Sequence, residues 1–351
     1  MEMVHHAPVL NPAKKPLCSV CIANFNGIDT LAECIDSLLK QDCDFAIEII
    51  VHDDASTDDS VSYIQQHYPD VELLISQENS GFCVSNNRMV EIARGEFILL
   101  LNNDAALFPD ALRSLHEYAK QQSINGILGL PQYDMQNGEL IDRGFLHDPF
   151  LNPLPNLDDN RQQVAQVIGA CLWIPKTLWK ELGGFPEWFH TLAEDMFICC
   201  YARLKGYPVA VLTHSGFKHW VGKSLGGGKA CANQLRTTIY RRALSERNKT
   251  FVMILCYPAI LAWLLIPLHL ILLIVEGLLL GIIKRKTQLW KEIYWNCLKE
   301  IWLKRKFLWR NRRHIQRDRQ ISSTTFFKVH TLIPHKVRML MKYGIPEVNG
   351  K

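Results

Sequence analysis

Residues 95–104 read Gly-Glu-Phe-Ile-Leu-Leu-Leu-Asn-Asn-Asp, an apolar run that ends abruptly in three polar residues. A short, fully apolar run is typical of a strand that is buried on both faces of a sheet. Two earlier apolar runs, at 17–23 and 47–51, also end in Asn or His-Asp, and a segment with helical spacing follows each of them. This alternation predicts an α/β fold, a mostly parallel sheet with helices on both faces.

Further elements of this sheet follow the same alternation. An apolar stripe at helical spacing begins near Asp29, helices are expected at 60–67 and 86–93, and another strand is expected at 71–76. Ligands of open parallel sheets bind beyond the carboxyl ends of the strands, where loops and helix amino-termini converge. The polar residues that end the strands are therefore the first candidates for a functional site.

Two strand ends carry adjacent polar groups, Asp53 with Asp54, and the run 102–104. A helix cap needs only one acceptor, and adjacent carboxylates repel each other. The doubled groups therefore suggest a polyol, a base or a metal ion as their partner. Ser56 and Asp58, by contrast, have an ordinary explanation as helix caps.

Charge divides the chain of 351 residues into two different parts. Residues 1–248 contain 20 Lys and Arg against 30 Asp and Glu, whereas residues 249–351 contain 19 against 5. The second part is expected to face something anionic, such as phosphate or a lipid surface. A hydrophobic content of 48% excludes a disordered chain. The expected parts are a flexible amino-terminal arm at 1–16, an α/β domain at 17–248, an apolar helical segment at 249–286 and a basic amphipathic region at 287–351.

The eleven cysteines are expected to be reduced thiols, because most lie in apolar segments and not at the spacings of a disulfide framework. Cys18 and Cys21 have the CxxC spacing, but no second such pair completes a zinc site, which favours two buried core thiols. Residues 1–16 lack a cationic start followed by an apolar stretch, the pattern of a secretory signal. The α/β domain is therefore expected in the cytosol.

The polar strand ends belong to a longer series of motifs. Val20–Asn26, Ile50–Asp58, Asn79–Phe82 and Gly95–Asp104 resemble the successive blocks of family 2 glycosyltransferases with a GT-A fold. The downstream motifs resemble, in order and spacing, the rhamnosyltransferase-like branch of bacterial surface-polysaccharide enzymes. These motifs are Gly169–Pro175, Gly183–Pro186, Glu194-Asp195, Gly206-Tyr207 and His219-x-x-Gly222-x-Ser224.

This resemblance implies a nucleotide-sugar site at the carboxyl ends of the strands. Asp53 would contact the uracil or thymine base or the ribose, since a carboxylate accepts from a base N–H or a ribose hydroxyl. Ala23 and Phe25 would lie behind the nucleoside. The implied nucleotide-sugar-binding residues are Ala23, Phe25, Asn26, Asp53, Asp54, Asn79, Gly81, Asn102 and Asn103.

The resemblance also implies a divalent cation, Mn²⁺ or Mg²⁺. Asn102 and Asp104 occupy the two ends of the motif written DxD, in which an acid binds the cation that bridges the donor phosphates. Asp104 is the implied metal ligand, and Asn102 replaces the first acid. His219 lies where related enzymes return a carboxyl-terminal residue to the metal or the diphosphate.

Glu194 and Asp195 are implied as the catalytic pair. Inversion at an anomeric carbon needs a general base for the acceptor hydroxyl, which is the role of Asp195, while Glu194 binds the acceptor or raises the pKa of Asp195. Taken alone, the two acids could simply begin the helix through Arg203, because first-turn acids suit the helix dipole. Two positions depart from the family pattern. Phe197 replaces a second acid, which concerns the acceptor, and Ala55 replaces a common Gly, so its turn must avoid a positive φ or carry strain.

Residues 251–283 contain no Lys, Arg or Asp. As one helix at about 1.5 Å per residue they would exceed a bilayer core of about 30 Å. Pro258, Pro267, His269 and Glu276 interrupt the segment, and a single span would put the following basic residues outside the cytoplasm, against the positive-inside bias. The sequence therefore predicts a re-entrant or broken hairpin, or a monotopic association, at the cytoplasmic face of the inner membrane.

The segment at 290–302 supports contact with an anionic membrane surface. Aromatic and apolar residues fall at helical spacing, with Lys and Glu opposite, as in helices that lie in the headgroup layer. The alternative is a core helix of a soluble second domain. No motif that reads nucleic acid accompanies the basic run at 304–319, so no nucleic-acid partner is expected.

The resemblance implies an inverting, metal-dependent hexosyl or rhamnosyl transferase for surface polysaccharide biosynthesis. Its donor would be a UDP- or dTDP-sugar and its acceptor a glycan that is lipid-linked. The Gln-x-x-Arg-Trp motif of processive synthases is missing, so one sugar is transferred per encounter. The alternative is a catalytically silent protein of the same fold that binds sugar nucleotides or glycans. A nucleotidyltransferase is disfavoured because residues 24–27 do not form a Gly-rich basic loop.

Overall fold

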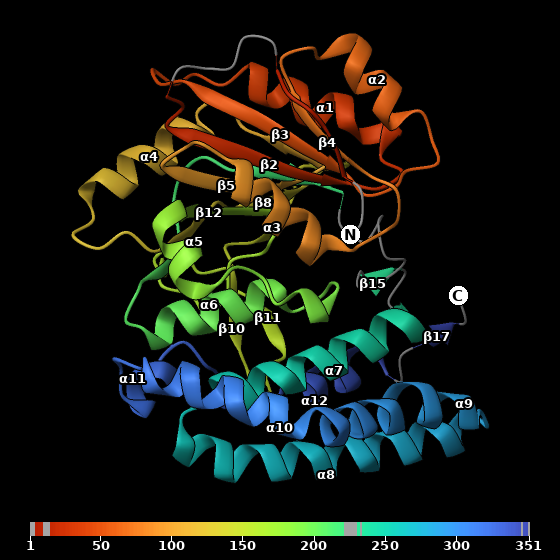
Figure 1. Ribbon diagram of the computed structural model, residues 1–351. Coiled ribbons are helices and arrows are strands. Elements are labelled where there is room, and N and C mark those ends of the chain that lie inside the picture. The colour runs from red at the N-terminus through yellow and green to blue at the C-terminus, as the bar shows by residue number, and fades with distance from the viewer. Residues whose placement is uncertain (1–3, 10–14, 221–229, 232–233, 345–346, 350–351) are drawn as a thin grey trace. The chain divides into compact units, whose positions relative to one another are not determined.

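The computed structural model describes residues 4–9, 15–220, 230–231, 234–344 and 347–349 (Figure 1). The chain divides into two compact units. Unit 1 comprises residues 1–145, 155–202 and 207–220, and unit 2 comprises residues 146–154, 203–206 and 221–351. The first unit therefore ends before residue 248, where the sequence places the end of the α/β domain.

An eight-stranded sheet forms the centre of unit 1, with the order β1-β4-β3-β2-β5-β12-β7-β13. β2 runs parallel to β3 and β5, and β3 runs parallel to β4. β1 is antiparallel to β4, and β12 is antiparallel to both of its neighbours. The expected α/β fold with a mostly parallel sheet is confirmed. Its strands are β1 (Val4–Ala7), β2 (Cys18–Asn24), β3 (Ile47–Asp53), β4 (Glu72–Ser76), β5 (Phe97–Asn102), β7 (Ile127–Gly129), β12 (Cys171–Pro175) and β13 (Val209–Val211).

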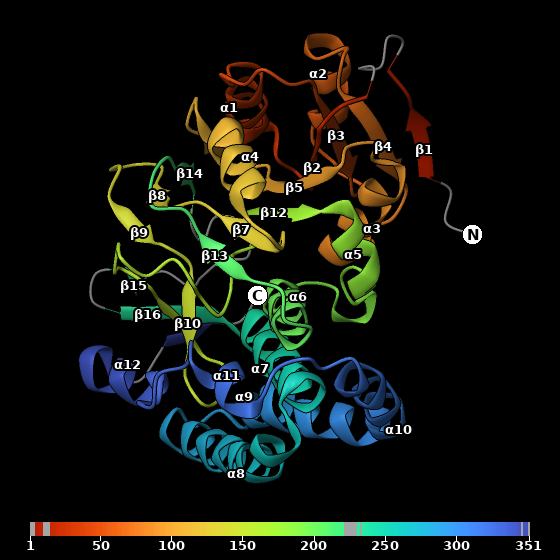
Figure 2. The ribbon, with the colours of Figure 1, turned by 90° about the vertical axis from the view of Figure 1, so that its left-hand side faces the viewer.

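Helices cover both faces of this sheet (Figures 1 and 2). Every residue from Cys18 to Ile22 is buried, although successive side chains of a strand point to opposite faces. Cys18, Val20 and Ile22 pack with the apolar stripe of α1, which explains the apolar character of these positions. The helices of this unit are α1 (Ile28–Leu39), α2 (Ser60–His67), α3 (Phe82–Ile92), α4 (Ala111–Gln121), α5 (Lys176–Leu182), the short η1 (Glu187–Phe189) and α6 (Glu194–Leu204), whose last two residues belong to unit 2.

A second, four-stranded sheet follows β5 and has the order β6-β14-β8-β9. In it His219 pairs with Ala105 on one side and with Asp134 on the other. This register brings the end of β14 next to the residues that follow β5. The strands are β6 (Ala105–Leu107), β8 (Gln132–Asp134), β9 (Leu140–Asp142) and β14 (Phe217–His219), and a separate pair is formed by β10 (Phe145–His147) and β11 (Pro153–Pro155).

Unit 2 is mainly helical. Tyr257 and Pro258 separate α7 from α8, so the long apolar run is broken there, whereas Pro267 lies inside α8. A π-helical turn, η2, joins α9 to α10. The elements are α7 (Ile239–Cys256), α8 (Ala259–Ile283), α9 (Thr287–Leu289), η2 (Trp290–Trp295), α10 (Asn296–Arg317), α11 (Ser323–Phe327) and α12 (His335–Tyr343), with strands β15 (Ala230–Cys231), β16 (Gln234–Thr238) and β17 (Glu347–Asn349).

Two local features differ from the expected boundaries. Val4–Ala7, within the segment expected as a flexible arm, pairs with β4 along its whole length. α3 begins at Phe82 and not near Asn86, because Gly81 has a φ of +92° and ends the preceding loop directly before the helix. The ten cysteine side chains that the structure describes are free thiols, most of them buried.

Ala55, which occupies the turn after β3, has a φ of +64°. A left-handed backbone is strained for a residue with a Cβ and unstrained for glycine. Ala55→Gly should therefore stabilise the protein by about 0.5 to 1 kcal/mol, the strain released less the entropy that glycine adds to the unfolded chain. Denaturant unfolding followed by circular dichroism measures the difference.

The matched control is Ala32→Gly in the interior of α1, where the same exchange should lower stability by about 1 kcal/mol. Equal destabilisation by the two substitutions would contradict a strained turn at Ala55.

Candidate functional site

The carboxyl ends of β2, β3 and β5 meet at one edge of the large sheet. Ala23 is registered beside Asn102, and Asn24 is registered beside Asp53. Asn24 is buried, and its Nδ2 donates to Oδ2 of Asp53 at 2.8 Å while its Oδ1 accepts from Nδ2 of Asn103 at 2.7 Å. One amide side chain therefore ties together the ends of three neighbouring strands.

Asp53 organises the turn that follows its own strand. Its two carboxylate oxygens accept hydrogen bonds from the backbone N–H of Ser56, at 2.9 Å, and from the Ser56 hydroxyl, at 2.7 Å. The Ser56 hydroxyl also accepts from the backbone N–H of Asn26. Asp53 is almost fully buried, and these contacts fix the loop that follows β3.

Asp54 holds the second loop of the site. Its Oδ1 accepts from the N–H and the hydroxyl of Ser80, each at 2.8 Å, and its Oδ2 accepts from the N–H of Gly81 at 2.8 Å. The side chain of Asn79 reaches the Asp54 carbonyl at 3.4 Å. The acid after β3 thereby fixes the loop that leads into α3.

The residues after β5 meet the end of β14. Nε2 of His219 lies 3.1 Å from Oδ1 of Asp104 and 3.4 Å from Nδ2 of Asn102. Nδ1 of His219 lies 3.0 Å from Nε2 of Gln132, and the Oε1 atom of Gln132 is buried with no hydrogen-bond partner among the described residues. The four side chains form one contiguous polar group.

This group fits one divalent cation in part. A carboxylate oxygen of Asp104 and an imidazole nitrogen of His219 are both ligands for Mn²⁺, and they already lie in contact. Turning the Gln132 amide would let its unpartnered Oε1 accept a hydrogen bond from Nδ1–H of His219. The other ring nitrogen, Nε2 of His219, would then be unprotonated and could bind a metal. Within the described ranges, no three His, Cys, Asp or Glu side chains gather as a metal site, so oxygens of the ligand would have to complete the coordination.

Glu194 and Asp195 begin α6, as the sequence predicts. The carboxylate of Asp195 accepts from the N–H of Gly169 at 3.1 Å and from its own neighbour Met196 at 2.7 Å, and Gln166 adds a side-chain hydrogen bond. Burial raises the pKa of Asp195 against the effect of these donors. Burial and the adjacent Asp195 carboxyl raise the pKa of Glu194 to about 8, and its Oε2 has no partner within the part of the chain that the structure describes.

The segment that leads into this acid pair has an unusual backbone. His190, Leu192 and Ala193 all have φ values between +65° and +69°. The carbonyl of His190 accepts from the N–H of Cys83 in α3, and a Cβ added to Gly81 would lie 2.2 Å from the His190 ring. Three left-handed residues without glycine concentrate strain directly before the acids, a feature typical of functional segments.

Two adjacent residues join the acid pair to the end of β5. The N–H of Gly169 donates to Asp195, and the carbonyl of Ala170 accepts from the N–H of Asn102 at 3.1 Å. An ideal Cβ on Gly169 would lie 3.6 Å from the Phe82 ring, at the start of α3. The predicted donor loops, the Asp104–His219 pair and the Glu194–Asp195 pair therefore form one continuous site on unit 1.

The predicted residues do not all lie inside it. Phe25 and Asn26 are exposed, and Ala23 is partly exposed. Gly222 and Ser224 lie outside the described residues. Sequence reasoning missed Asn24, Gln132 and Gln166, which hold the predicted residues in place. Asn24 is a polar residue at a strand end, and that signal could have identified it. The two glutamines become neighbours of the site only through contacts between residues far apart in the sequence.

Residues 19–176 match the family model described as Glycosyl transferase family 2. This part of the chain is similar to the family 2 glycosyltransferases. Chondroitin synthase of Escherichia coli is 34% identical over 134 residues, which cover 37% of this chain and 19% of that protein. Poly(ribitol-phosphate) beta-glucosyltransferase of Bacillus spizizenii is 29% identical over 201 residues, which cover 55% of this chain and 30% of that protein. The chain thus spans less than a third of the length of these two relatives.

The fold also has solved counterparts. The crystal structure of GalNAc-T7 with UDP, GalNAc and Mn²⁺ matches with a TM-score of 0.55 at 16% sequence identity, and the match covers 70% of this chain and 49% of that one. This likeness agrees with the GT-A fold that the motifs imply.

The raised pKa of Glu194 makes a prediction about stability. A folded carboxyl whose pKa is about 8 holds a proton that the unfolded chain, near pH 4.5, has already lost, so stability falls as the pH rises from about 4.5 to about 8. Glu194→Gln removes the ionisable group and with it this contribution to the pH dependence of stability. Relative to the parent protein, the variant should gain thermal stability between about pH 5 and about pH 8 and show no further gain above that, as measured by calorimetry.

The exposed Glu33→Gln in α1 serves as the control and should show a difference in melting temperature that does not change with pH. A Glu194→Gln difference that is equally flat would mean that Glu194 is ionised in the folded protein.

Proposed function

We propose that the chain is an inverting glycosyltransferase that moves one sugar from a nucleoside-diphosphate donor to a glycan acceptor in polysaccharide biosynthesis. The observation that carries this proposal is the connection, through Gly169 and Ala170, of the acid pair at α6 to the polar group at the end of β5. A buried carboxyl that could accept a proton, connected to side chains that could hold a cation, is the combination that displacement of a diphosphate would use.

The donor would bind along the carboxyl edge of β2, β3 and β5. The loops fixed by Asp53 and Asp54 would receive the nucleoside. Asp104 and His219 would hold Mn²⁺ or Mg²⁺, which neutralises charge on the leaving diphosphate. The blocks shared with the rhamnosyltransferase-like branch support a UDP- or dTDP-linked hexose or rhamnose.

In the chemical step, Asp195 would accept the proton of the acceptor hydroxyl. The acceptor hydroxyl attacks the anomeric carbon, its proton passes to the Asp195 carboxylate, and the bond from that carbon to the diphosphate breaks, which inverts the configuration. Hydrogen bonds from Gly169, Met196 and Gln166 hold the carboxylate in one orientation. Glu194, whose neutral form burial favours, would donate a hydrogen bond to the acceptor.

The acceptor is proposed to be lipid-linked, and the enzyme to work at the cytoplasmic face of the plasma membrane. The net positive second part of the chain and its apolar helix α8 support this location. The Bacillus relative named as a poly(ribitol-phosphate) beta-glucosyltransferase supports a polymer as the class of acceptor.

Replacing Asp195 tests the assignment of the base. Asp195→Asn keeps the shape but cannot accept the proton, so release of nucleoside diphosphate in the presence of acceptor should fall by about a hundredfold to ten-thousandfold. Nucleotide affinity should stay within about twofold. Coupled detection of the released nucleoside diphosphate and calorimetric titration measure the two quantities.

Asp59→Asn, an exposed acid at the start of α2, is the matched control and should transfer sugar at the parental rate. Full activity in Asp195→Asn would remove Asp195 from the mechanism. Release of pyrophosphate in place of nucleoside diphosphate would indicate nucleotidyl transfer.

Replacing Asp104 tests the donor site separately. The parent protein should bind UDP or dTDP more tightly with Mn²⁺ than without it, and Asp104→Ala should lose that metal-dependent increase while retaining its fold. Calorimetric titration with each nucleotide, with and without Mn²⁺, measures it. Metal-dependent binding without transfer to any acceptor would favour the silent binding protein, and no nucleotide binding at all would exclude the donor site.

A further inference from the structure

α8 has one face against unit 2 and one face exposed. The buried residues Ala262, His269, Leu273, Gly277 and Leu280 recur at helical spacing. A Cβ on Gly277 would lie 2.5 Å from the Trp290 ring and 2.6 Å from the Tyr294 ring, so this face is closely packed. In Figures 1 and 2 the other helices of unit 2 lie on one side of α8.

The opposite face is a continuous apolar stripe. Its members are exposed, and most of them recur at intervals of three or four residues along the helix. They are Ile260, Leu264, Leu268, Ile271, Val275, Leu278, Leu279 and Ile282. At about 1.5 Å per residue the stripe is roughly 33 Å long. Exposed apolar surface of this length marks an interaction site.

Lys284, Arg285 and Lys286 follow the stripe directly and are all exposed. Within α10, the exposed Trp302 and Trp309 carry arginines over their rings, Arg305 at 4.2 Å and Arg313 at 5.9 Å from the ring centroids. Apolar surface, exposed Trp and clustered cations are the composition of helices that bind anionic lipid headgroups.

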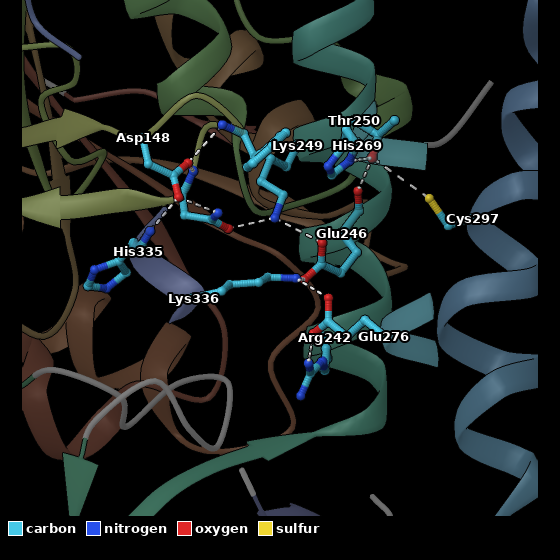
Figure 3. Close-up of polar contacts among 12 residues, drawn as sticks. Asp148, Arg242, Glu246, Lys249, Thr250, His269, Glu276, Cys297, His335 and Lys336 are labelled. Atoms are coloured by element: carbon cyan, nitrogen blue, oxygen red, sulfur yellow. Dashed lines mark hydrogen bonds and ion pairs between the residues drawn. The ribbon is translucent and has the colours of Figure 1, made fainter. Parts of the chain in front are cut away.

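The inner face of α8 carries polar residues at mid-helix (Figure 3). Nε2 of His269 lies 2.8 Å from the hydroxyl of Thr250 in α7. Glu276 forms ion pairs with Arg242 of α7, at 2.5 Å, and with Lys336 of α12, at 2.7 Å. Lys336 also pairs with Glu246, which in turn pairs with Lys249. The middle of α8 is thereby tied to charged residues of two other helices.

These ties decide the orientation of α8 in a membrane. His269 contacts residue 250 and Glu276 contacts residue 242, so α7 runs antiparallel alongside the centre of α8. If α8 crossed the bilayer, that centre would carry the charged side chains of α7 and α12 into the hydrocarbon, at a cost of several kcal/mol each. With the helix axis in the membrane plane, only the apolar stripe enters the lipid.

We propose that α8 is a monotopic membrane anchor that lies parallel to the surface of an anionic bilayer, with its outer stripe in the acyl region and Lys284–Lys286 at the headgroups. This proposal deepens the membrane part of the proposed function. Its test uses lipid binding and depth but no sugar transfer, so either proposal can fail alone.

Flotation with phosphatidylcholine vesicles, with and without phosphatidylglycerol, measures binding. The parent protein should float with anionic vesicles. Leu264→Gln/Ile271→Gln/Leu278→Gln should reduce the partition coefficient about a hundredfold or more. Lys284→Gln/Arg285→Gln/Lys286→Gln should reduce it about fivefold per charge on anionic vesicles only.

Leu39→Gln/Ile124→Gln/Leu157→Gln is the matched control, because all six leucines and isoleucines of the two triple variants are between 47% and 68% exposed. This control on unit 1 should bind vesicles like the parent. Equal loss of vesicle binding in the α8 variant and in the unit 1 control, or no loss in either, would overturn the proposal. A dimer that forms without lipid and that the α8 variant alone abolishes would also overturn it, because a second copy of the chain would then cover the stripe.

Nitroxide labels at single cysteines distinguish lying flat from crossing. In a Cys43→Ser/Cys231→Ser background, labels at Ile260→Cys, Ile271→Cys and Ile282→Cys should show the same shallow depth by power saturation with oxygen and a nickel chelate. A label at position 271 that is far deeper than the other two would mean that α8 spans the bilayer.

Discussion

The parallel register of β2 with β3 and β5 is the constraint on which the candidate site depends. It places Asn24 beside Asp53 and Ala23 beside Asn102, so three polar strand ends meet at one edge of the sheet. A buried amide in that position must satisfy its own donors and acceptor. Asn24 does so with Asp53 and Asn103, and the loops of the site inherit their conformation from that arrangement.

The acids of the site divide by how their oxygens are satisfied. Asp53 and Asp54 accept hydrogen bonds on both carboxylate oxygens from the loops they hold. The main role of these two carboxylates is therefore to fix the loops. Glu194 is buried with one oxygen unpartnered among the described residues, next to a second buried carboxyl. Buried carboxyls with a raised pKa cluster at functional sites, and this environment distinguishes the α6 acids from the loop-forming ones.

The sequence was sufficient where periodicity and local chemistry decide the structure. The apolar runs gave the core strands, and the expected helix at 60–67 has the bounds of α2. His219 and Asp195 were singled out by resemblance, and nothing local to either residue shows why it should join the site. The reason is the pairing of His219 with Ala105 and the hydrogen bond from Gly169 to Asp195, contacts between residues 26 or more positions apart. The sequence did not indicate Gln132 for the same reason, because Gln132 becomes a neighbour of His219 only when β8 pairs with β14.

The strained loop before α6 completes this account. Each left-handed residue with a side chain costs about 1 to 2 kcal/mol, and His190, Leu192 and Ala193 lie within four positions of one another. The loop is held by the hydrogen bond from Cys83 to His190, and Gly81 leaves the space that the His190 ring occupies. The same loop that Asp54 fixes from β3 therefore also fixes the approach to Glu194 from the other side. A displacement of one strand end would therefore shift both the loop that Asp54 holds and the acid pair at the start of α6.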